Sequence, residues 1–254
     1  MPKVRGLFRV WPFIIPLALG CEAIDVWRPP APTDDQYNKG LIVFYPGSAN
    51  LHMEGIGFFT AFQEAGLELA MEERQWSAYL EHFITPAEII QPKITANARA
   101  EADRLAAYIR THPGCPVTLI SYSGGAVFII QVAGLMPDDA HVDRVIIMSG
   151  GISKTTDLTA ALEKTTQGII NYWSPKEIGP TYVSSLLGLA DNTHLPPAST
   201  FGFDQVHPNL IQVSWSPDMS EFGNNGEHLD YIVNIPWLKQ YVVPWVIVEK
   251  PEAG

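Results

Sequence analysis

The chain has 254 residues, of which 46% are hydrophobic and 17% are charged, and its formal net charge is −11. This length and composition indicate a globular protein with one large domain, and they exclude a disordered chain and a wholly membrane-embedded one. The acidic balance excludes nucleic acid as a partner, because the sequence has no basic stripe that could neutralise phosphates.

The N-terminal segment has the pattern of an export signal. Three basic residues precede an apolar run, residues 10–20, which is short for a membrane span and contains two prolines. Residues 17–21, with the sequence LALGC, resemble the lipobox of bacterial lipoproteins. The resemblance implies removal of residues 1–20 and lipidation of Cys21, so we expect an exported protein of the periplasm or cell envelope, anchored to a membrane. An ordinary cleaved export signal is one alternative, and an unprocessed anchor or a misplaced start is the other.

Residues 21–39 are rich in proline and polar residues, which predicts a tether that leads into a single domain at 40–254. Cys115 is the second cysteine of the chain, and no Cys-x-x-Cys or Cys/His spacing around it predicts a metal site. A partly buried free thiol is expected there. A disulfide with Cys21 is the alternative, and it would exclude lipidation.

Strand and helix patterns alternate along the domain. Apolar and β-branched runs predict strands at 41–45, 67–71, 117–120, 142–148, 168–173 and 210–215. Helical patterns cover 55–65, 96–112, 126–133, 157–165 and 232–241. This alternation predicts a doubly wound α/β fold whose mostly parallel sheet is covered by helices on both faces. An irregular section spans residues 174–208, and residues 178–206 within it are expected to form a small cap-like segment or a substrate-facing loop.

The segment SYSGG, residues 121–125, joins a predicted strand to an apolar helix. Ser123 has the small residues Ser121 and Gly125 two positions before and after it, and a strained strand-to-helix turn needs small residues because the two backbones press together. Ser123 would then stand exposed at the helix N-terminus, where the amide of Gly124 can face a developing oxyanion. A serine- and glycine-rich turn without chemistry is the alternative.

These features resemble the α/β-hydrolase superfamily over residues 40–245. The family places a nucleophile, an acid and a histidine, in this order, on loops after successive strands. The resemblance implies that Ser123 is the nucleophile, Glu177 the acid and His228 the base. Asp157, which follows the preceding strand, is the alternative acid.

The residues around these positions carry the resemblance. The segment YWSPKE, residues 172–177, is similar to the family's YSxxD segment, with Glu where Asp is commoner. Residues 226–228, Gly-Glu-His, are similar to the family's Gly-x-His loop. The loop at 46–49 is where the family places a second oxyanion donor; Pro46 departs from the usual His, and the amide of Ser48 is the expected donor beside Gly124.

The chemistry requires this set of side chains. A serine hydroxyl is a weak nucleophile until a base accepts its proton, and His228 Nε2 would accept it. Glu177 would hold the other ring nitrogen and stabilise the imidazolium.

The resemblance therefore implies a serine hydrolase that cleaves a carboxylic ester of a small molecule or lipid through an acyl-enzyme. This chemistry needs no cofactor and no metal. A non-catalytic envelope binding or scaffold lipoprotein with the same fold is one alternative, and an acyltransferase or amidase with the same triad is another. Five apolar or aromatic residues of the irregular segment would either line an acyl pocket or pack in the core: Tyr182, Leu186, Leu187, Phe201 and Phe203.

Overall fold

The structure is a computed structural model of the chain, and it describes residues 30–48, 52–77, 81, 85, 87–177, 189–191 and 193–246. The predicted signal segment and Cys21 lie outside these residues, as do Tyr182, Leu186 and Leu187. Within the described ranges, no helix is both long enough and apolar enough to cross a membrane.

Six parallel strands form one sheet in the order β2-β1-β3-β4-β5-β6. The strands are β1 (Leu41–Tyr45), β2 (Ala70–Glu73), β3 (Val117–Tyr122), β4 (Arg144–Met148), β5 (Ile169–Trp173) and β6 (Leu210–Ser214). The four central strands are mostly apolar and almost wholly buried, as expected for parallel strands covered on both faces. The predicted fold class, a doubly wound α/β protein with a parallel sheet, is confirmed.

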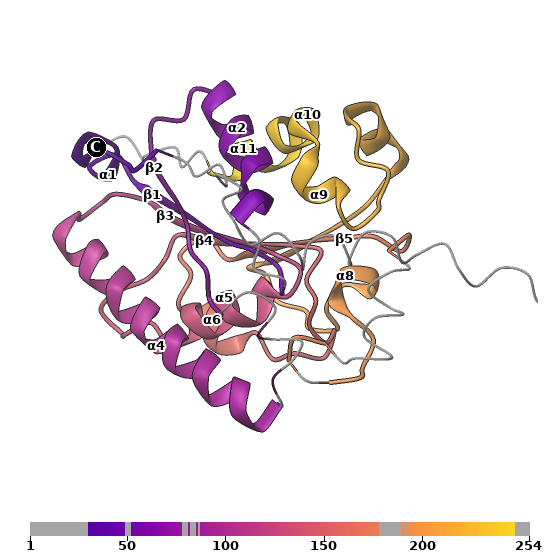
Figure 1. Cartoon of the computed structure of the whole chain (residues 1–254), viewed down its shortest axis with the longest axis horizontal. Helices are drawn as coiled ribbons and strands as arrows, with labels where there is room; N and C mark the ends of the chain where they lie inside the picture. Colours follow the sequence, from indigo (N-terminus) through magenta and orange to yellow (C-terminus); the bar gives the residue numbers. More distant parts are fainter. Residues whose placement is uncertain are drawn as a thin grey trace, which may run out of the picture.

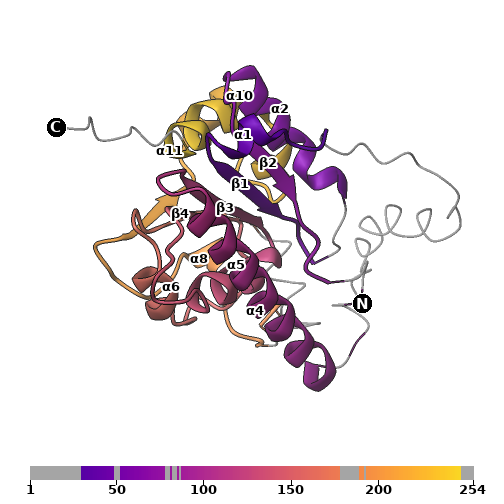
Figure 2. The same cartoon turned by 90° about the vertical axis from the view of Figure 1, so that its left-hand side faces the viewer.

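Helices cover both faces of this sheet (Figures 1 and 2). One face packs against α4 (Ala87–Thr111), α5 (Gly125–Gly134) and α6 (Thr159–Glu163), and the other against α2 (Ile56–Glu64), α9 (Asp230–Val233), α10 (Ile235–Trp237) and α11 (Val243–Val246). The residues of β1 divide accordingly, because successive strand side chains point to opposite faces. Leu41, Val43 and Tyr45 join the first core cluster, and Ile42 and Phe44 join the second.

Helix α4 begins at Ala87, well before the predicted start at 96. Pro92 interrupts the helical pattern in the sequence, yet the buried stripe of α4 extends back through Ile94 to Ile90 on the same face. Tertiary burial of these isoleucines therefore outweighs the hydrogen bond that a proline removes from a helix.

Two other elements differ from the sequence expectation. The predicted helix at 232–241 is divided into α9, α10, a π-helical turn at Leu238–Val242 and α11. Pro236 is the second residue of α10 and lacks the amide that would continue α9. Strand β2 includes the acidic residues Glu72 and Glu73 because Glu72, at least, is paired: it accepts a hydrogen bond from Tyr37 Oη at 2.7 Å.

Tyr37 belongs to a short helix, α1 (Asp34–Tyr37), within the last residues of the predicted tether. Thr33 and Gln36 form a capping box at its start. Cys115 is a free, partly buried thiol whose Sγ donates to Asn38 O at 3.1 Å.

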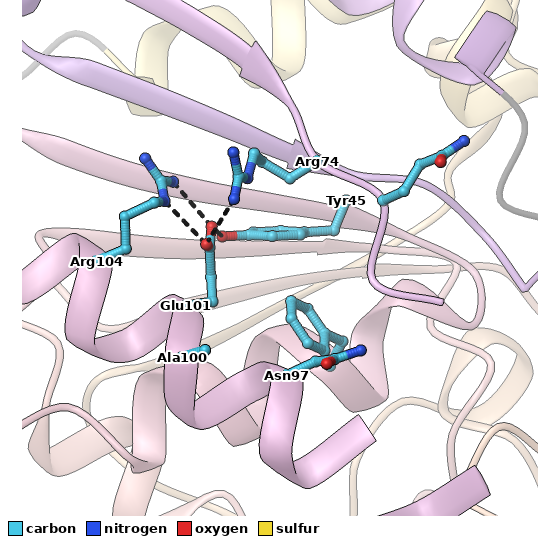
Figure 3. Close-up of a pocket in the computed structure, with 8 residues that line it drawn as sticks. Tyr45, Arg74, Asn97, Ala100, Glu101 and Arg104 are labelled. Carbon is cyan, nitrogen blue, oxygen red and sulfur yellow. Dashed lines mark hydrogen bonds and ion pairs between the residues drawn. The ribbon is translucent and has the colours of Figure 1, made fainter. Parts of the chain in front are cut away.

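A network of charged residues supports the carboxyl end of β1, where the sheet meets the predicted site (Figure 3). Glu101 of α4 accepts hydrogen bonds from Tyr45 Oη at 2.8 Å and from Arg104 Nε and Nη2 at 2.9 and 2.8 Å. Arg74 Nη2 lies 3.4 Å from the same carboxylate. These residues line a cavity of about 300 Å³ that also borders Phe128 of α5. The network therefore ties the end of β1 to α4 and to Arg74, the residue that follows β2.

We expect Glu101→Gln to lower the free energy of unfolding at pH 7 by about 2 kcal/mol, since it removes the anionic partner of Arg74 and one of the two carboxylates that pair with Arg104. Burial alone would raise the pKa of Glu101, but hydrogen bonds and charge from Arg104, with Tyr45 and Arg74, hold that pKa below its usual 4.5. A depressed folded-state pKa contributes stability above pH 4.5, and this contribution is lost as the pH falls through the folded-state value.

Urea denaturation at pH 7 and at several values below pH 4.5 would measure both effects. The matched control is Asp139→Asn, which removes an exposed partner of Arg110 and should change the stability far less, because solvent screens an exposed ion pair. Equal losses for the two variants, or a loss for Glu101→Gln that does not shrink in acid, would contradict this account.

Candidate active site

Ser123 occupies a sharp turn between β3 and α5. Its φ of +51° lies in the left-handed region, which non-glycine residues rarely adopt. Two backbone hydrogen bonds hold the turn: Ser123 N donates to Met148 O at 3.0 Å, and Gly151 N donates to Ser123 O at 2.8 Å. The strained conformation is thus fixed by the end of β4 and the loop that follows it.

The loop after β1, residues 46–48, packs directly on this turn. A Cβ atom at Gly125 would lie 2.5 Å from Pro46 O, and one at Gly124 would collide with Ser48 Oγ. Neither position has room for a side chain while the backbone and Ser48 keep their places. The glycines after Ser123 are therefore required by the close approach of the two backbones, as the sequence pattern indicates.

The three residues predicted to form a triad lie in contact. His228 Nε2 is 3.0 Å from Ser123 Oγ, and His228 Nδ1 is 3.0 Å from Glu177 Oε2. Glu177 is completely buried, whereas the His228 side chain is 28% exposed. Because a carboxylate can only accept, Nδ1 carries the proton toward Glu177, and Nε2 is left to accept the Ser123 hydroxyl proton.

The loop after β5 presents Glu177 through backbone and side-chain hydrogen bonds. Glu177 N donates to Ser174 O at 3.1 Å. Thr200 of the short helix α8 (Ala198–Phe201) donates its hydroxyl to Glu177 O at 3.0 Å. The acid loop is therefore fixed at its main chain, independently of the carboxylate's own contacts.

The loop after β6 carries His228, and the carboxylate of Asp230 holds this loop through two backbone hydrogen bonds. Asp230 Oδ2 accepts hydrogen bonds from the amides of Asn225 at 2.8 Å and Glu227 at 3.2 Å. Gly226 has a φ of +88°, and a Cβ there would lie 2.6 Å from Ser174 Oγ. The acid loop and the histidine loop therefore touch at this glycine.

Ser149, at the end of β4, also takes part, and the sequence analysis did not identify it. Its hydroxyl donates to Glu177 Oε2 at 2.7 Å and contacts His228 Nδ1. It is completely buried, and its φ is +53°. The only signal in the sequence is the pair of glycines that follows Ser149 at a strand end, the setting in which a strained turn can form.

The alternative acid, Asp157, lies elsewhere. It is exposed, and its Oδ1 accepts from Thr159 N at 2.9 Å, ahead of helix α6. Its pKa is lowered by these hydrogen bonds to Thr159. Glu177 is therefore the acid in contact with His228, and Asp157 makes a local turn.

Other candidate residues are distributed over the molecule. Phe203 is buried in the first core cluster and acts as a packing residue, whereas Phe201 is exposed. Three other acids accept hydrogen bonds from residues other than His228: Asp191 from Ser153 N, Asp204 from Lys154 Nζ and Asp218 from Tyr241 Oη. Among the described residues, no cluster of three or more His, Cys, Asp or Glu side chains could hold a metal ion.

The amides of Ser48 and Gly124 are the sequence's two candidate oxyanion donors. In the described part of the chain, neither amide donates a hydrogen bond to the protein. The amide of Gly47, between Pro46 and Ser48, donates instead to Glu54 Oε2. Both candidate amides thus remain available on the loop and the turn that pack together beside Ser123.

No protein-family model matches the chain, and no curated protein matches it either. Solved structures give weak matches. A predicted CIB-like hydrolase from Thermoplasma acidophilum is 17% identical with a TM-score of 0.47, over 84% of this chain and 87% of that chain. A lipase-esterase related protein from Clostridium acetobutylicum is 12% identical with a TM-score of 0.47, over 85% and 97% of the two chains. Trichoderma reesei cutinase is 14% identical with a TM-score of 0.38, over 83% and 77%. At these levels the function has to be inferred from the residues of the site itself.

We expect Ser149→Gly to be more stable than Ser149→Ala by about 1 kcal/mol, because only glycine adopts a positive φ without steric cost. Both variants lose the hydrogen bond to Glu177, so the difference between them isolates the backbone strain. Urea denaturation of the two variants measures it. The control is Ala133→Gly in α5, where the usual order should hold and glycine should destabilise by about 1 kcal/mol. A Ser149→Gly variant less stable than Ser149→Ala would contradict the strain.

Proposed function

We propose that the protein is a serine hydrolase that cleaves carboxylic esters through an acyl-enzyme on Ser123. The observation that carries the proposal is the unbroken chain of contacts from Ser123 Oγ through His228 to Glu177 Oε2, with both links at 3.0 Å. A nucleophile, a base and an orienting acid within hydrogen-bond reach are what acyl transfer requires. A turn without chemistry has no need of this alignment.

In the proposed acylation step, Ser123 Oγ attacks the ester carbonyl carbon while His228 Nε2 accepts the hydroxyl proton. The carbonyl π pair moves to oxygen and forms a tetrahedral oxyanion. Glu177, which is buried and bonded to Nδ1, stabilises the imidazolium. His228 then gives the proton to the leaving alcohol oxygen as the C–O bond breaks, which leaves the acyl group on Ser123. Water, deprotonated by His228, repeats the sequence and releases the carboxylic acid.

The amides of Gly124 and Ser48 are proposed to bind the oxyanion. Gly124 follows the nucleophile at the N-terminus of α5, where amides and the helix dipole favour negative charge. Ser48 N lies against Gly124 across the close contact between loop and turn. Two neighbouring donors held by packed backbone would need little rearrangement when the oxyanion forms.

An apolar ester or lipid is the proposed substrate class. Leu229 directly follows His228, and Val233 lies one helical turn later; they are 62% and 58% exposed. Two large apolar side chains left in solvent beside the base support an apolar group on the substrate. An amine or a second alcohol in place of water would turn the same steps into amide or acyl transfer chemistry.

Export is part of the proposal and rests on the sequence alone. Cleavage before Cys21 and its lipidation would place the domain at a membrane of the cell envelope, at the end of the segment 21–39. Metabolic labelling of the full chain with a radioactive or clickable fatty acid, compared with Cys21→Ala, tests the anchor separately from the catalysis.

Fluorophosphonate labelling tests the nucleophile. We expect the wild type to react and Ser123→Ala to lose labelling completely, because the probe needs an activated serine hydroxyl. Ser121→Ala is the control within the same turn: the Ser121 hydroxyl is buried and has no hydrogen-bond partner among the residues that the structure describes, so its removal should leave labelling intact. No reaction of the folded wild type would overturn the hydrolase proposal and favour a non-catalytic binding protein.

Replacing the two candidate acids tests the triad. Glu177→Gln should lower kcat by at least about 10³-fold on a short-chain p-nitrophenyl ester, because His228 loses the anion that orients and stabilises it. Asp157→Asn should leave kcat unchanged, since Asp157 is exposed at the start of α6. Equal kcat values for the wild type and Glu177→Gln would remove Glu177 from the triad.

A further inference from the structure

Glu54 is a partly buried acid beside the proposed triad that the steps above do not use. It lies in the 3₁₀ turn His52–Gly55, immediately before α2. Its Oε2 accepts the hydrogen bond from Gly47 N. This carboxyl therefore holds the loop after β1 through one of its oxygens.

Gly47 lies between this carboxyl and the nucleophile. A Cβ atom at Gly47 would stand 3.2 Å from Ser123 Cβ, 3.3 Å from Glu54 Oε2 and 3.3 Å from Tyr122 Cδ1. The backbone at Gly47 is thus in contact with the turn on one side and with Glu54 on the other. Any rotation of this backbone would be transmitted to the amide of Ser48, the next along the chain.

The peptide group between Pro46 and Gly47 is bonded at both of its ends. Its carbonyl oxygen accepts from Trp76 Nε1 at 2.8 Å, and its N–H donates to Glu54. A glycine rotates easily because it has no side chain to restrict φ. A peptide that is bonded from opposite sides cannot turn over without losing both hydrogen bonds in a buried setting.

We propose that Glu54 is a positioning residue which, together with Trp76, locks the Pro46–Gly47 peptide so that the Ser48 amide faces the oxyanion. The inference rests on the proposed hydrolase function and adds the group that fixes one of its two donors. Because the peptide is held before substrate arrives, the donor needs no reorganisation in the transition state.

The charge of Glu54 is compatible with this role. Burial raises the pKa of Glu54 to about 7, against the opposing effects of the Gly47 hydrogen bond and of His228. Tyr122 also faces it, and burial keeps the pKa of that phenol well above its usual value, so Tyr122 stays neutral. Protonated Glu54 still accepts through Oε2, and a neutral acid does not repel a developing oxyanion. The hydrogen bond from Gly47 N to Glu54, rather than the charge of Glu54, is therefore what positions the peptide in this proposal.

Two variants of similar size separate the hydrogen bond from the charge. Glu54→Gln keeps an oxygen acceptor for Gly47 N and should keep kcat on a short-chain p-nitrophenyl ester within about 3-fold of the wild type. Glu54→Leu has no acceptor and should lower kcat and the fluorophosphonate labelling rate by about 10- to 100-fold, with KM within about 2-fold. A merely structural role would not give this split between kcat and KM, nor rescue by Gln.

Trp76→Phe removes the hydrogen bond at the carbonyl end of the same peptide group. It also provides a second test if Glu54→Leu folds poorly. It should lower kcat in the same direction, and the double variant should lose less than the product of the two single effects, since both act on one peptide group. Thermal unfolding of each variant, with Asp157→Asn as the control acid, checks that the folded fraction is unchanged.

A wild-type labelling rate in Glu54→Leu would overturn the inference, and so would a Glu54→Gln variant as slow as Glu54→Leu, since the charge would then be what counts. Either result leaves the hydrolase proposal standing, because the wild type still labels on Ser123. A wild type that does not label at all is the different outcome that overturns the hydrolase proposal, and this inference with it.

Discussion

The close approach of backbone segments at the carboxyl ends of β1, β3 and β4 is the constraint on which the site depends. The loop 46–48 contacts the turn at Gly124 and Gly125 at distances that exclude side chains. Parallel strands make this approach unavoidable, because their carboxyl ends meet at one edge of the sheet. Packing therefore requires small residues at the three strand ends. The same packing places Ser123 beside the two amides.

The sequence predicts those parts of the molecule that depend on local pattern. Continuous apolar runs mark the central strands, since a strand covered on both faces has no polar side. The small residues around Ser123 predict a tight turn. The order of Ser123, Glu177 and His228 along the chain predicts three side chains that the fold brings into contact. The segment 172–177 favours Glu177 over Asp157 because it offers a wider match than a single acid, and Glu177 is the one of the two that contacts His228.

Residues that act through tertiary contacts were not predictable in the same way. Ser149 is one serine among many until β4 sets its hydroxyl between Glu177 and His228. Glu54 has the sequence context of an ordinary helix start. Its hydrogen bond with Gly47 N forms only because the loop after β1 folds back on it. The division of the C-terminal helix and the early start of α4 likewise depend on what is buried against the sheet, and a periodic pattern does not reveal which partner will cover it.

The site residue His228 lies 105 positions after Ser123 and 51 after Glu177, beyond the last strand of the sheet. Strands β3 to β6 occur in the sheet in the order in which they occur in the chain, so β6 is both the last synthesised and the outermost. A chain that has emerged only as far as the loop after β5 already contains Ser123 and Glu177 but lacks the imidazole between them. The contact between Ser123 and His228 therefore cannot form until β6 and the loop after it have been synthesised, and a shorter chain has no imidazole beside Ser123.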